Sequence, residues 1–457
     1  MPANLYRMSS TLSLKKYIAV SAILLVLIMT VLDGTLVNVA LPVMAESFGV
    51  SDSSIVWIVT IYQLMITMLL LPVSSYGDIF SYKKSFMTGV AVFTLSSVLC
   101  AASQSFPMIL AARALQGIGA ACIMGVNIAL TRLIYPREIL GRGMALNTMV
   151  IAVATASGPT LAGTILSAAS WHWLFLINVP FGILAFILGY KLLPENPHRE
   201  KKRVFDKTSA IENVIAFGLI FFALGNFARK ENIALSFLLL AAGAVTGYFY
   251  LRRQRHREAP MFPVDLFKIR LYTLSICTSV SSFIAQNLTM ISIPFMLMGS
   301  LGYPEITTGL LMTPWPLATM LVSPLAARFV EKHNPGKTAA AGMAVFATGI
   351  GLLFTLPSHN VAEWDIIWRM AVCGIGFGMF QTPNNIVMVL ATPVHRTGSA
   401  GGMQSTARLV GQTLGAISVT LIFAMTASGI TAVKFCLSAA VCFSLIAGIF
   451  SISRKIS

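Results

Sequence analysis

Charged residues are scarce in this chain. Of its 457 residues, 11% are charged and 56% are hydrophobic, whereas a soluble globular domain carries about 25% charged residues. The charges form short clusters separated by apolar runs of about twenty residues, which is the length that an α-helix needs to cross a bilayer. This pattern excludes a soluble protein. It predicts an all-α, multi-pass membrane protein with almost no room for a soluble domain.

Signatures of enzymes, metal sites and disulfides are also missing from the sequence. The six cysteines lie within apolar runs at unpaired spacings, so neither a disulfide framework nor a metal site is expected. The six histidines fall in loops or at helix ends, which disfavours a histidine proton relay across the membrane. Phosphate-loop, GxSxG and HExxH motifs are absent, so we expect no enzyme, no ATP-driven pumping and no cofactor.

Fourteen apolar runs are predicted to cross the membrane, and the first is too long for the core of a signal peptide. They lie at 18–40, 54–74, 85–104, 107–131, 143–168, 173–193, 209–228, 234–251, 272–297, 307–327, 338–357, 364–391, 404–424 and 430–452. A weak repeat relates "RALQGIG" at 113–119 to "RMAVCGIG" at 369–376, which favours two related bundles. The predicted organisation is therefore an N-terminal segment at 1–17, six-helix bundles at 18–193 and 272–452, a linker with two additional spans at 194–271, and a tail at 453–457.

The distribution of basic residues predicts which end of the helices faces the cytoplasm. If both termini are cytoplasmic, the opposite side holds five of the 32 Lys and Arg residues: Arg113, Arg229, Lys230, Arg369 and Lys434. The reverse orientation would violate the positive-inside rule. Topology thus explains the net charge of +16, and no nucleic-acid partner is implied. The rule does not separate twelve spans from fourteen, but the length and apolarity of the runs at 209–228 and 234–251 favour fourteen.

Asp33 is the one acidic residue that we place clearly within a predicted span, in the segment "LDGTLVNVALP". An intramembrane carboxylate is costly and marks a proton or ion site by default. Asp33 lies 17 residues beyond Lys16, or about 25 Å along an ideal helix, and Arg113 lies about 9 Å inside the span 107–131. Both residues therefore sit in the outer half of the bilayer, where they can meet if their helices are neighbours. The alternatives are a structural salt bridge for Asp33 and snorkelling to the interface for Arg113.

Other polar and helix-breaking residues in the spans are candidates for the substrate path. In "ASGPTLAG", Gly158 and Gly163 permit close helix approach, and Pro159 can kink the helix. Scattered amides can either line a water-filled cavity or join helices to one another. Four of them are our candidates for the substrate cavity: Gln63, Gln116, Asn287 and Asn384.

Over nearly its whole length the chain resembles the major facilitator superfamily, in particular its fourteen-helix drug:proton antiporter branch. "LDGTLVNVALP" resembles that branch's motif in the first helix, "RALQGIGAA" the motif in the fourth helix, and "SGPTLAG" the antiporter motif in the fifth. "WHWLFLINVPFG" and "GYPEITTGLLMTPWPL" resemble the segments that enter the sixth and tenth helices. The resemblance implies two six-helix bundles with two extra central helices.

The segment after the second span departs from the family pattern, which reads glycine, aspartate, arginine, glycine and basic residues. "SYGDIFSYKK" keeps Asp78, Lys83 and Lys84, but Ile79 stands in place of the arginine and serines replace glycines. Any charge network of this loop is therefore expected to be altered or weaker. Whether this divergence weakens transport stays open.

The resemblance also implies roles for residues that match the family's motifs. Asp33 would take part in proton coupling, and Arg113 would tune its protonation. The antiporter hinge would consist of Gly158, Pro159 and Gly163. The cytoplasmic gating loop, which would stabilise the outward-open state, would contain Asp78, Lys83 and Lys84.

We therefore expect a secondary transporter of a bacterial inner membrane, which exports small amphipathic or cationic compounds against proton entry by alternating access. Its partners would be the small-molecule substrate, protons and the lipid bilayer. We expect a monomer, and association with envelope partners stays open. One alternative is a carrier of the same fold for a specific metabolite such as a sugar, siderophore or amino-acid derivative. The other is a membrane sensor that transports nothing.

Overall fold

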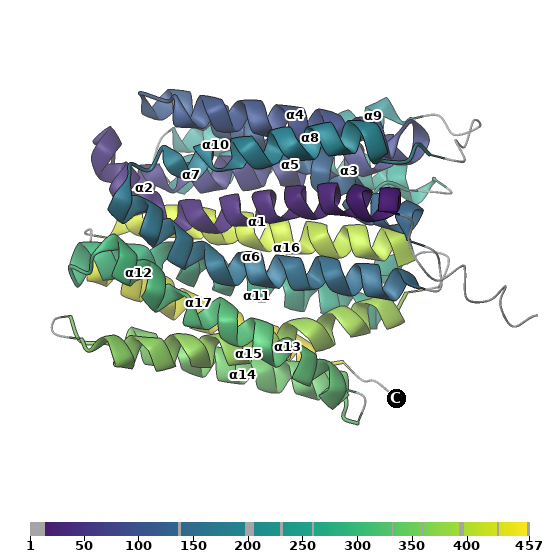
Figure 1. The fold of residues 1–457 in the computed structure, drawn as a ribbon. Helices are drawn as coiled ribbons and strands as arrows, with labels where there is room; N and C mark the ends of the chain where they lie inside the picture. The colour runs from purple at the N-terminus through teal and green to yellow at the C-terminus, as the bar shows by residue number, and fades with distance from the viewer. Residues whose placement is uncertain are drawn as a thin grey trace, which may run out of the picture.

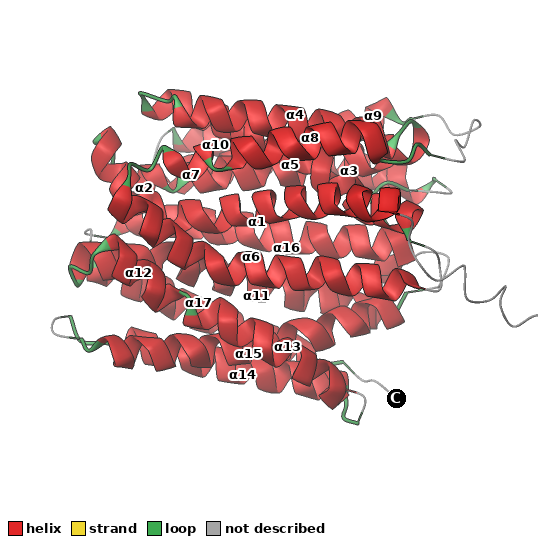
Figure 2. Ribbon diagram, in the orientation of Figure 1, coloured by secondary structure: helices red, strands yellow, loops and turns green. Residues whose placement is uncertain are grey.

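The computed structural model describes residues 14–135, 139–196, 205–228, 232–257, 260–330, 332–358, 361–392, 397–426 and 429–454. Within these ranges the chain is helical, with short connections and no strand (Figure 2). The helices run side by side along one common direction (Figure 1). The predicted all-α membrane architecture is confirmed.

Two groups of helices form two bundles, separated in sequence by a helical pair. The N bundle contains α1 (Leu14–Phe48), α2 (Asp52–Ile55), α3 (Trp57–Ile79), α4 (Tyr82–Ala101), α5 (Phe106–Ile134), α6 (Leu140–Ala168), α7 (Trp173–Leu176) and α8 (Asn178–Leu192). The pair is α9 (Lys207–Ala228) and α10 (Ile233–Arg255). After the short η2 (Leu266–Lys268), the C bundle contains α11 (Arg270–Pro294), η3 (Phe295–Ser300), α12 (Glu305–Met312), α13 (Pro314–Val330), α14 (Pro335–Phe354), α15 (Glu363–Leu390), α16 (Thr397–Met425) and α17 (Ile430–Ile452).

Thirteen helical segments among the described residues are long and apolar enough to cross a membrane. The predicted span at 364–391 forms α15, which has 28 residues but is not among the thirteen. Its apolarity is lowered by charged residues in its first turns and by amides such as Asn384 and Asn385. The predicted span at 307–327 is two helices, because Pro314 has no amide hydrogen with which to continue the hydrogen bonding of α12.

The weak sequence repeat marks a close helix–helix contact that occurs in both bundles. A Cβ atom added to Gly119 of α5 would lie 2.6 Å from the amide nitrogen of Phe93 in α4. In the C bundle, Gly376 of α15 approaches the amide nitrogen of Phe346 in α14 in the same way. Each glycine is the last residue of its repeat, so the repeat ends where two helix backbones touch. Small residues at such positions let membrane helices pack without a hydrophobic driving force.

The helical pair α9 and α10 covers one seam between the bundles. α9 packs against both α3 and α16, and α10 packs against α9. Phe221 of α9 shares a small apolar core with Leu64 of α3 and Ile417 of α16. At one end of the pair, Asp206 caps α9 by accepting from the amide of Ser209, and it forms an ion pair with Arg257 at 2.8 Å.

The two bundles share a core in one half of the molecule. The largest apolar core joins both bundles, and its N-bundle members lie in the half remote from the start of α1, as Leu41 and Ile109 do. Near the start of α1, N-bundle residues form a second core, joined by Leu409 of α16. C-bundle residues form a third. The bundles are therefore packed together mainly at the remote end.

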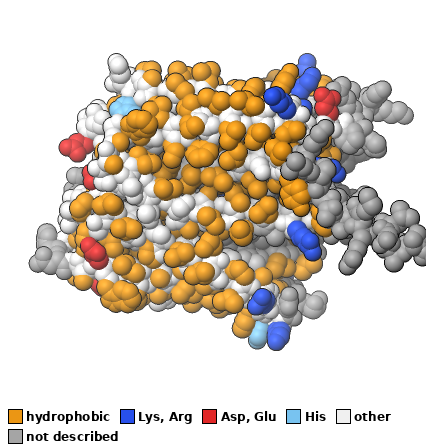
Figure 3. Space-filling model, in the orientation of Figure 1, with side chains coloured by type: hydrophobic (Ala, Val, Ile, Leu, Met, Phe, Trp, Pro, Cys, Tyr) orange, Lys and Arg blue, Asp and Glu red, His pale blue; other side chains and the backbone are white. Residues whose placement is uncertain are grey.

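Basic side chains gather at the end where α1 begins and α17 ends, and we call this the basic end (Figure 3). Hydrophobic side chains cover the surface between this end and the opposite, remote end. Many large apolar residues are exposed there, including Leu238 at 66% and Ile449 at 64%. A solvent-facing monomer rarely shows such a continuous apolar surface, whereas a lipid-facing one requires it.

The contact between α6 and the C bundle provides a test of the bundle arrangement. The hydroxyl oxygens of Thr160 and Thr313 lie 2.6 Å apart across this contact. In a chain freed of its native cysteines, Thr160→Cys with Thr313→Cys should form a disulfide readily, because the two side chains already meet. If the chain is a transporter, as its motifs predict, the bond should stop transport, and reduction should restore it.

The matched control for this cross-link is Thr164→Cys with Thr313→Cys. Thr164 lies one turn further along α6 and is exposed. Gel mobility under oxidising and reducing conditions measures both pairs. Equal cross-linking of the two pairs, or transport unaffected by the Thr160 bond, would contradict this arrangement.

Candidate functional site

A buried ion pair joins α1 to α5 in the middle of the N bundle. The Nη1 atom of Arg113 lies 2.6 Å from Oδ2 of Asp33, and the two side chains are 1% and 0% exposed. The structure thus brings together the two residues for which the sequence predicted a common depth. An ion pair removed from water is stable only when additional hydrogen bonds satisfy both partners.

Both members of the pair have these additional partners. The other carboxylate oxygen of Asp33, Oδ1, accepts from Nε2 of Gln116 at 2.9 Å and from Nδ2 of Asn178 at 3.1 Å. Arg113 donates to Oε1 of Gln116 at 2.6 Å and to the carbonyl of Ile58 at 3.2 Å. Three donors therefore surround the carboxylate, and both of its oxygens are satisfied.

An aromatic ring and a glycine fix the arginine in place. The guanidinium carbon of Arg113 lies 4.1 Å from the centre of the Tyr62 ring, a range at which a desolvated cation–π contact is strong. One turn further along α5, a Cβ on Gly117 would lie 2.7 Å from the carbonyl oxygen of Tyr62. Gly117 therefore lets α5 approach α3 so closely that Arg113 reaches both the ring and the Ile58 carbonyl.

The predicted hinge residues lie where α6 meets both bundles. Gly158 faces the hydroxyl of Thr35 on α1, with no room for a side chain. A Cβ on Gly163 would lie 2.5 Å from the carbonyl oxygen of Glu305 on α12. Pro159 lies inside α6, which stays one continuous helix. Whether these residues act as a hinge remains a prediction, but their position is the contact between bundles.

The predicted gating segment is mostly helical. Asp78 lies in the last turn of α3, and Lys83 and Lys84 lie in the first turn of α4. Asp78 accepts a hydrogen bond from the hydroxyl of Tyr82 at 2.8 Å. Lys83 lies 6.0 Å from the centre of the Tyr190 ring. The gating role of this segment remains a prediction.

The four cavity candidates divide into two kinds. Gln63 of α3 and Asn287 of α11 meet between the bundles, with Oε1 and Nδ2 3.4 Å apart. Gln116 is instead fully buried within the ion-pair network, where it hydrogen-bonds Asp33 and Arg113. Asn384 is fully buried inside the C bundle.

The surroundings of Asn384 show why it joins helices. Its Nδ2 donates to Oγ of Ser279 at 2.7 Å, and its Oδ1 accepts from Nη2 of Arg454 at 2.6 Å. Arg454 follows the end of α17 and is 3% exposed, and burial lowers the pKa of its guanidinium to about 10. Asn384 and Gln116 therefore connect helices, contrary to their predicted cavity position.

The sequence reasoning missed three residues near this site. Asn178 and Tyr62 complete the ion-pair surroundings, and each is a polar group inside an otherwise apolar run, which is the signal that could have found them. The third is Arg408. It is not among the five basic residues that the positive-inside rule leaves on the outer side, because the predicted span begins at residue 404, only four residues before it. The structure instead begins α16 at Thr397, which places Arg408 well inside the helix.

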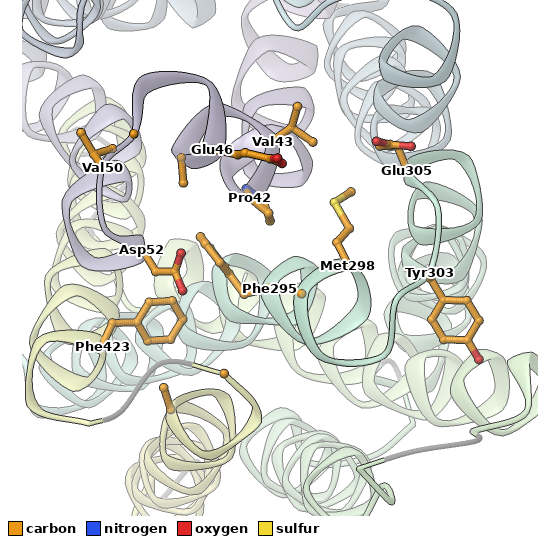
Figure 4. Close-up of a pocket in the computed structure, with 15 residues that line it drawn as sticks. Pro42, Val43, Glu46, Val50, Asp52, Phe295, Met298, Tyr303, Glu305 and Phe423 are labelled. Carbon is orange, nitrogen blue, oxygen red and sulfur yellow. The ribbon is translucent and has the colours of Figure 1, made fainter.

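A pocket of about 660 Å³ opens at the remote end, between α1, α2, η3, α12, α16 and α17. Glu46, Asp52 and Glu305 surround it together with apolar side chains such as Phe295 and Met298 (Figure 4). None of the described residues that line this pocket is basic. Carboxylates grouped at one mouth raise the local concentration of cations, protons included.

Two bundles of membrane-spanning helices that pack against each other define a transporter architecture of the parallel-repeat type. The family model of the Major Facilitator Superfamily matches residues 23–264 and 274–455. The chain belongs to this superfamily, as its motifs predicted. The members of this family are transporters, so the chain is a transporter and not an enzyme.

Individual relatives and a solved structure agree with this assignment. The chain is 47% identical over 407 residues to the Uncharacterized transporter YebQ of Escherichia coli (strain K12), which covers 89% of each chain. It is 28% identical over 392 residues to the Multidrug resistance protein Stp of Mycobacterium tuberculosis (strain CDC 1551 / Oshkosh), covering 85% of this chain and 72% of Stp. The crystal structure of a POT family transporter in complex with 5-aminolevulinic acid superposes with a TM-score of 0.70 at 13% identity, over 95% of this chain and 96% of that one, which shows the fold alone.

Breaking the ion pair from either side should destabilise the protein. Asp33→Asn leaves the buried charge of Arg113 uncompensated, and Arg113→Gln leaves that of Asp33. Each should cost about 3 kcal/mol, at the low end for a broken buried pair because other hydrogen bonds remain. The double variant should lose less than the sum of the two. Thermal unfolding in detergent measures all three variants, and additive losses would show that the two charges do not stabilise each other.

Proposed function

We propose that this protein is a proton-coupled exporter of small amphipathic compounds that works by alternating access. The observation that carries the proposal is the ion pair of Asp33 and Arg113, which is 0% and 1% exposed within a membrane bundle. A carboxylate at such a depth marks a proton site by default. Relatives such as Stp, whose name describes a multidrug resistance protein, support efflux as the direction of transport.

Protonation of Asp33 can break this ion pair at about the same cost as Asp33→Asn, about 3 kcal/mol. A neutral carboxyl no longer attracts the guanidinium, but Arg113 keeps its bonds to Gln116 and to the Ile58 carbonyl and its contact with the Tyr62 ring. The arginine is therefore not left as an isolated buried charge, which would cost several kcal/mol. The network thus has two arrangements that differ by one proton.

A short chain of contacts connects Asp33 to the boundary between bundles. Two residues beyond Asp33 on α1, Thr35 packs on Gly158 of α6. The next residue of α6, Pro159, holds its carbonyl against Gly309 of α12, without room for a side chain. A shift of α1 on protonation would therefore be transmitted to the contact between the bundles through two successive contacts, first α1 to α6 and then α6 to α12. A coupled transporter needs such a two-state element, biased by both proton and cargo.

We further propose that the basic end faces the cytoplasm of a bacterium and that the protein lies in its plasma membrane. The positive-inside rule supports this orientation, and bacterial relatives support the membrane. In this orientation the conformation described here is closed toward the outside, because the shared core lies at the remote end. The acidic pocket would then be the outer mouth, where protons arrive.

The experiment uses purified full-length protein in proteoliposomes with a pH-sensitive dye inside. A proton gradient is imposed, and amphipathic compounds are added one at a time. We expect proton movement that depends on the added compound. Asp33→Asn should reduce it by about tenfold or more, because that side chain can no longer take up a proton.

The matched control is Asp365→Asn, which removes the carboxylate of a second arginine pair, in the C bundle. Asp365 lies 2.8 Å from Arg369 but is 32% exposed, and it should retain wild-type proton movement. Wild-type coupling in Asp33→Asn would overturn the proton role. If no compound of the panel causes proton movement in vesicles that hold folded protein, the proposal of broad export is wrong. A carrier for one metabolite would then be favoured.

A further inference from the structure

Arg408 is a charge within the membrane-spanning part of the chain that the mechanism above does not use. It lies inside α16 and is half-buried. Its side chain has neither a hydrogen bond nor an ion pair with any residue that the structure describes. An arginine at the centre of a membrane helix costs about 2.5–3.5 kcal/mol on insertion scales. A partner of opposite charge would offset this cost.

The neighbours of Arg408 along α16 show which way the helix faces. Leu409 belongs to the N-bundle core, and Thr413 lies 3.4 Å from Thr67 of α3 through their hydroxyl oxygens. This face therefore contacts the N bundle. The adjacent face of α16 carries Leu414 and Ile417, which pack on α9.

A second face of α16 contacts α11 in the C bundle. A Cβ on Gly411 would lie 2.6 Å from the carbonyl oxygen of Val280, and one on Gly415 would lie 2.8 Å from Cβ of Asn287. Successive residues of an α-helix are turned by about 100°. Arg408 therefore falls between the face toward α11 and the face toward α3, on the side opposite α9. It points into the region between the two bundles.

The charge of Arg408 acts on the surroundings of the proton site. Arg408 interacts electrostatically with Tyr62, whose ring holds Arg113. On the same face of α16, the backbone carbonyl of Gln412 accepts from Nδ2 of Asn287 at 2.6 Å. The region between the bundles thus contains the cation, an aromatic ring and the amide of Asn287. Such groups, set among apolar side chains, are the usual lining of a small-molecule site.

Charge balance identifies the missing partner. Asp33 is already paired with Arg113, so Arg408 leaves one uncompensated positive charge between the bundles in the described part of the chain. A guanidinium pairs best with a planar or multi-oxygen anion, to which it can donate two parallel hydrogen bonds. A cationic compound would be repelled at this point.

We propose that Arg408 binds the acidic group of the cargo, and that the cargo is an amphipathic organic anion carrying a carboxylate, sulfonate or phosphate on an apolar body. The inference rests on the proposed transport function and narrows its substrate class. It excludes the cationic compounds that the sequence had left open. Cargo specificity is therefore assigned to the C bundle and proton binding to the N bundle.

Equilibrium binding of two dyes with the same ring system tests the charge preference. Fluorescein is anionic and rhodamine 6G is cationic, and fluorescence anisotropy reports the binding of either to full-length protein in phosphatidylcholine nanodiscs. We expect fluorescein to bind more tightly than rhodamine 6G. Arg408→Gln should weaken fluorescein binding by about tenfold or more, and Arg408→Lys by less, because a point charge keeps the attraction without the paired geometry.

The matched control is Arg252→Gln, which removes the same charge from an exposed position on α10 and should leave fluorescein binding unchanged. Thermal unfolding verifies that each variant is folded. Equal fluorescein affinity in Arg408→Gln and the wild type, tighter binding of rhodamine 6G, or no binding of either dye to folded protein would each overturn the proposal. Displacement of fluorescein by phosphatidylglycerol in the nanodisc would also overturn it, by assigning Arg408 to a lipid headgroup.

The binding assay separates this inference from the proposed proton coupling. Asp33→Asn should still bind fluorescein, since Arg408 is unchanged and one negative charge nearby is lost. Binding that survives in this variant, together with wild-type proton movement, would refute the proton role of Asp33 and leave the anion site intact. If Asp33→Asn loses proton movement but the wild type binds fluorescein and rhodamine 6G equally, the anion site is refuted and the proton role of Asp33 is supported.

Discussion

The structure depends on one constraint: a carboxylate and a guanidinium must share the buried interior of a helix bundle. Asp33 and Arg113 meet this constraint by drawing Gln116, Asn178, the Ile58 carbonyl and the Tyr62 ring around them. Four helices thereby converge on one point of the N bundle. Electrostatics in this medium is strong and poorly screened, so a change of one proton matters more here than anywhere on the surface.

The C bundle repeats the scaffold of the N bundle without repeating its chemistry. Gly119 and Gly376 bring equivalent helix pairs into backbone contact, yet the equivalent arginine pair of the C bundle, Arg369 with Asp365, lies within one helix and is partly exposed. Arg408 of the C bundle has no partner of opposite charge among the described residues. Two halves of one architecture have thus specialised, one around a balanced charge and the other around an unbalanced one.

The sequence predicted the features that follow from length and depth. Charged residues fix where spans begin, and counting from them placed Asp33 and Arg113 at one level. The prediction of span boundaries failed where small or polar residues at the start of a helix lower its mean hydropathy. The start of α16 reads "TGSAGGMQSTAR", and because it is poor in apolar residues the predicted span began too late and Arg408 was placed too near the membrane surface. Which way an amide faces is set by packing, so Gln116 and Asn384 could not be told from residues that line a cavity.

The helix α9 touches both bundles, and its two contacts differ in kind. Toward α3, Asn213 donates a hydrogen bond to the Met68 carbonyl at 2.7 Å, and Gly225 admits the ring of Trp57. Toward α16, the contact is apolar and built from side chains such as Ile417. The hydrogen bond between α9 and α3 resists displacement because it is directional. The apolar contact between α9 and α16 is not directional and permits sliding. If the bundles rock as the proposed alternating access requires, α9 should therefore move with the N bundle, and the C bundle should slide past it at the α9–α16 contact.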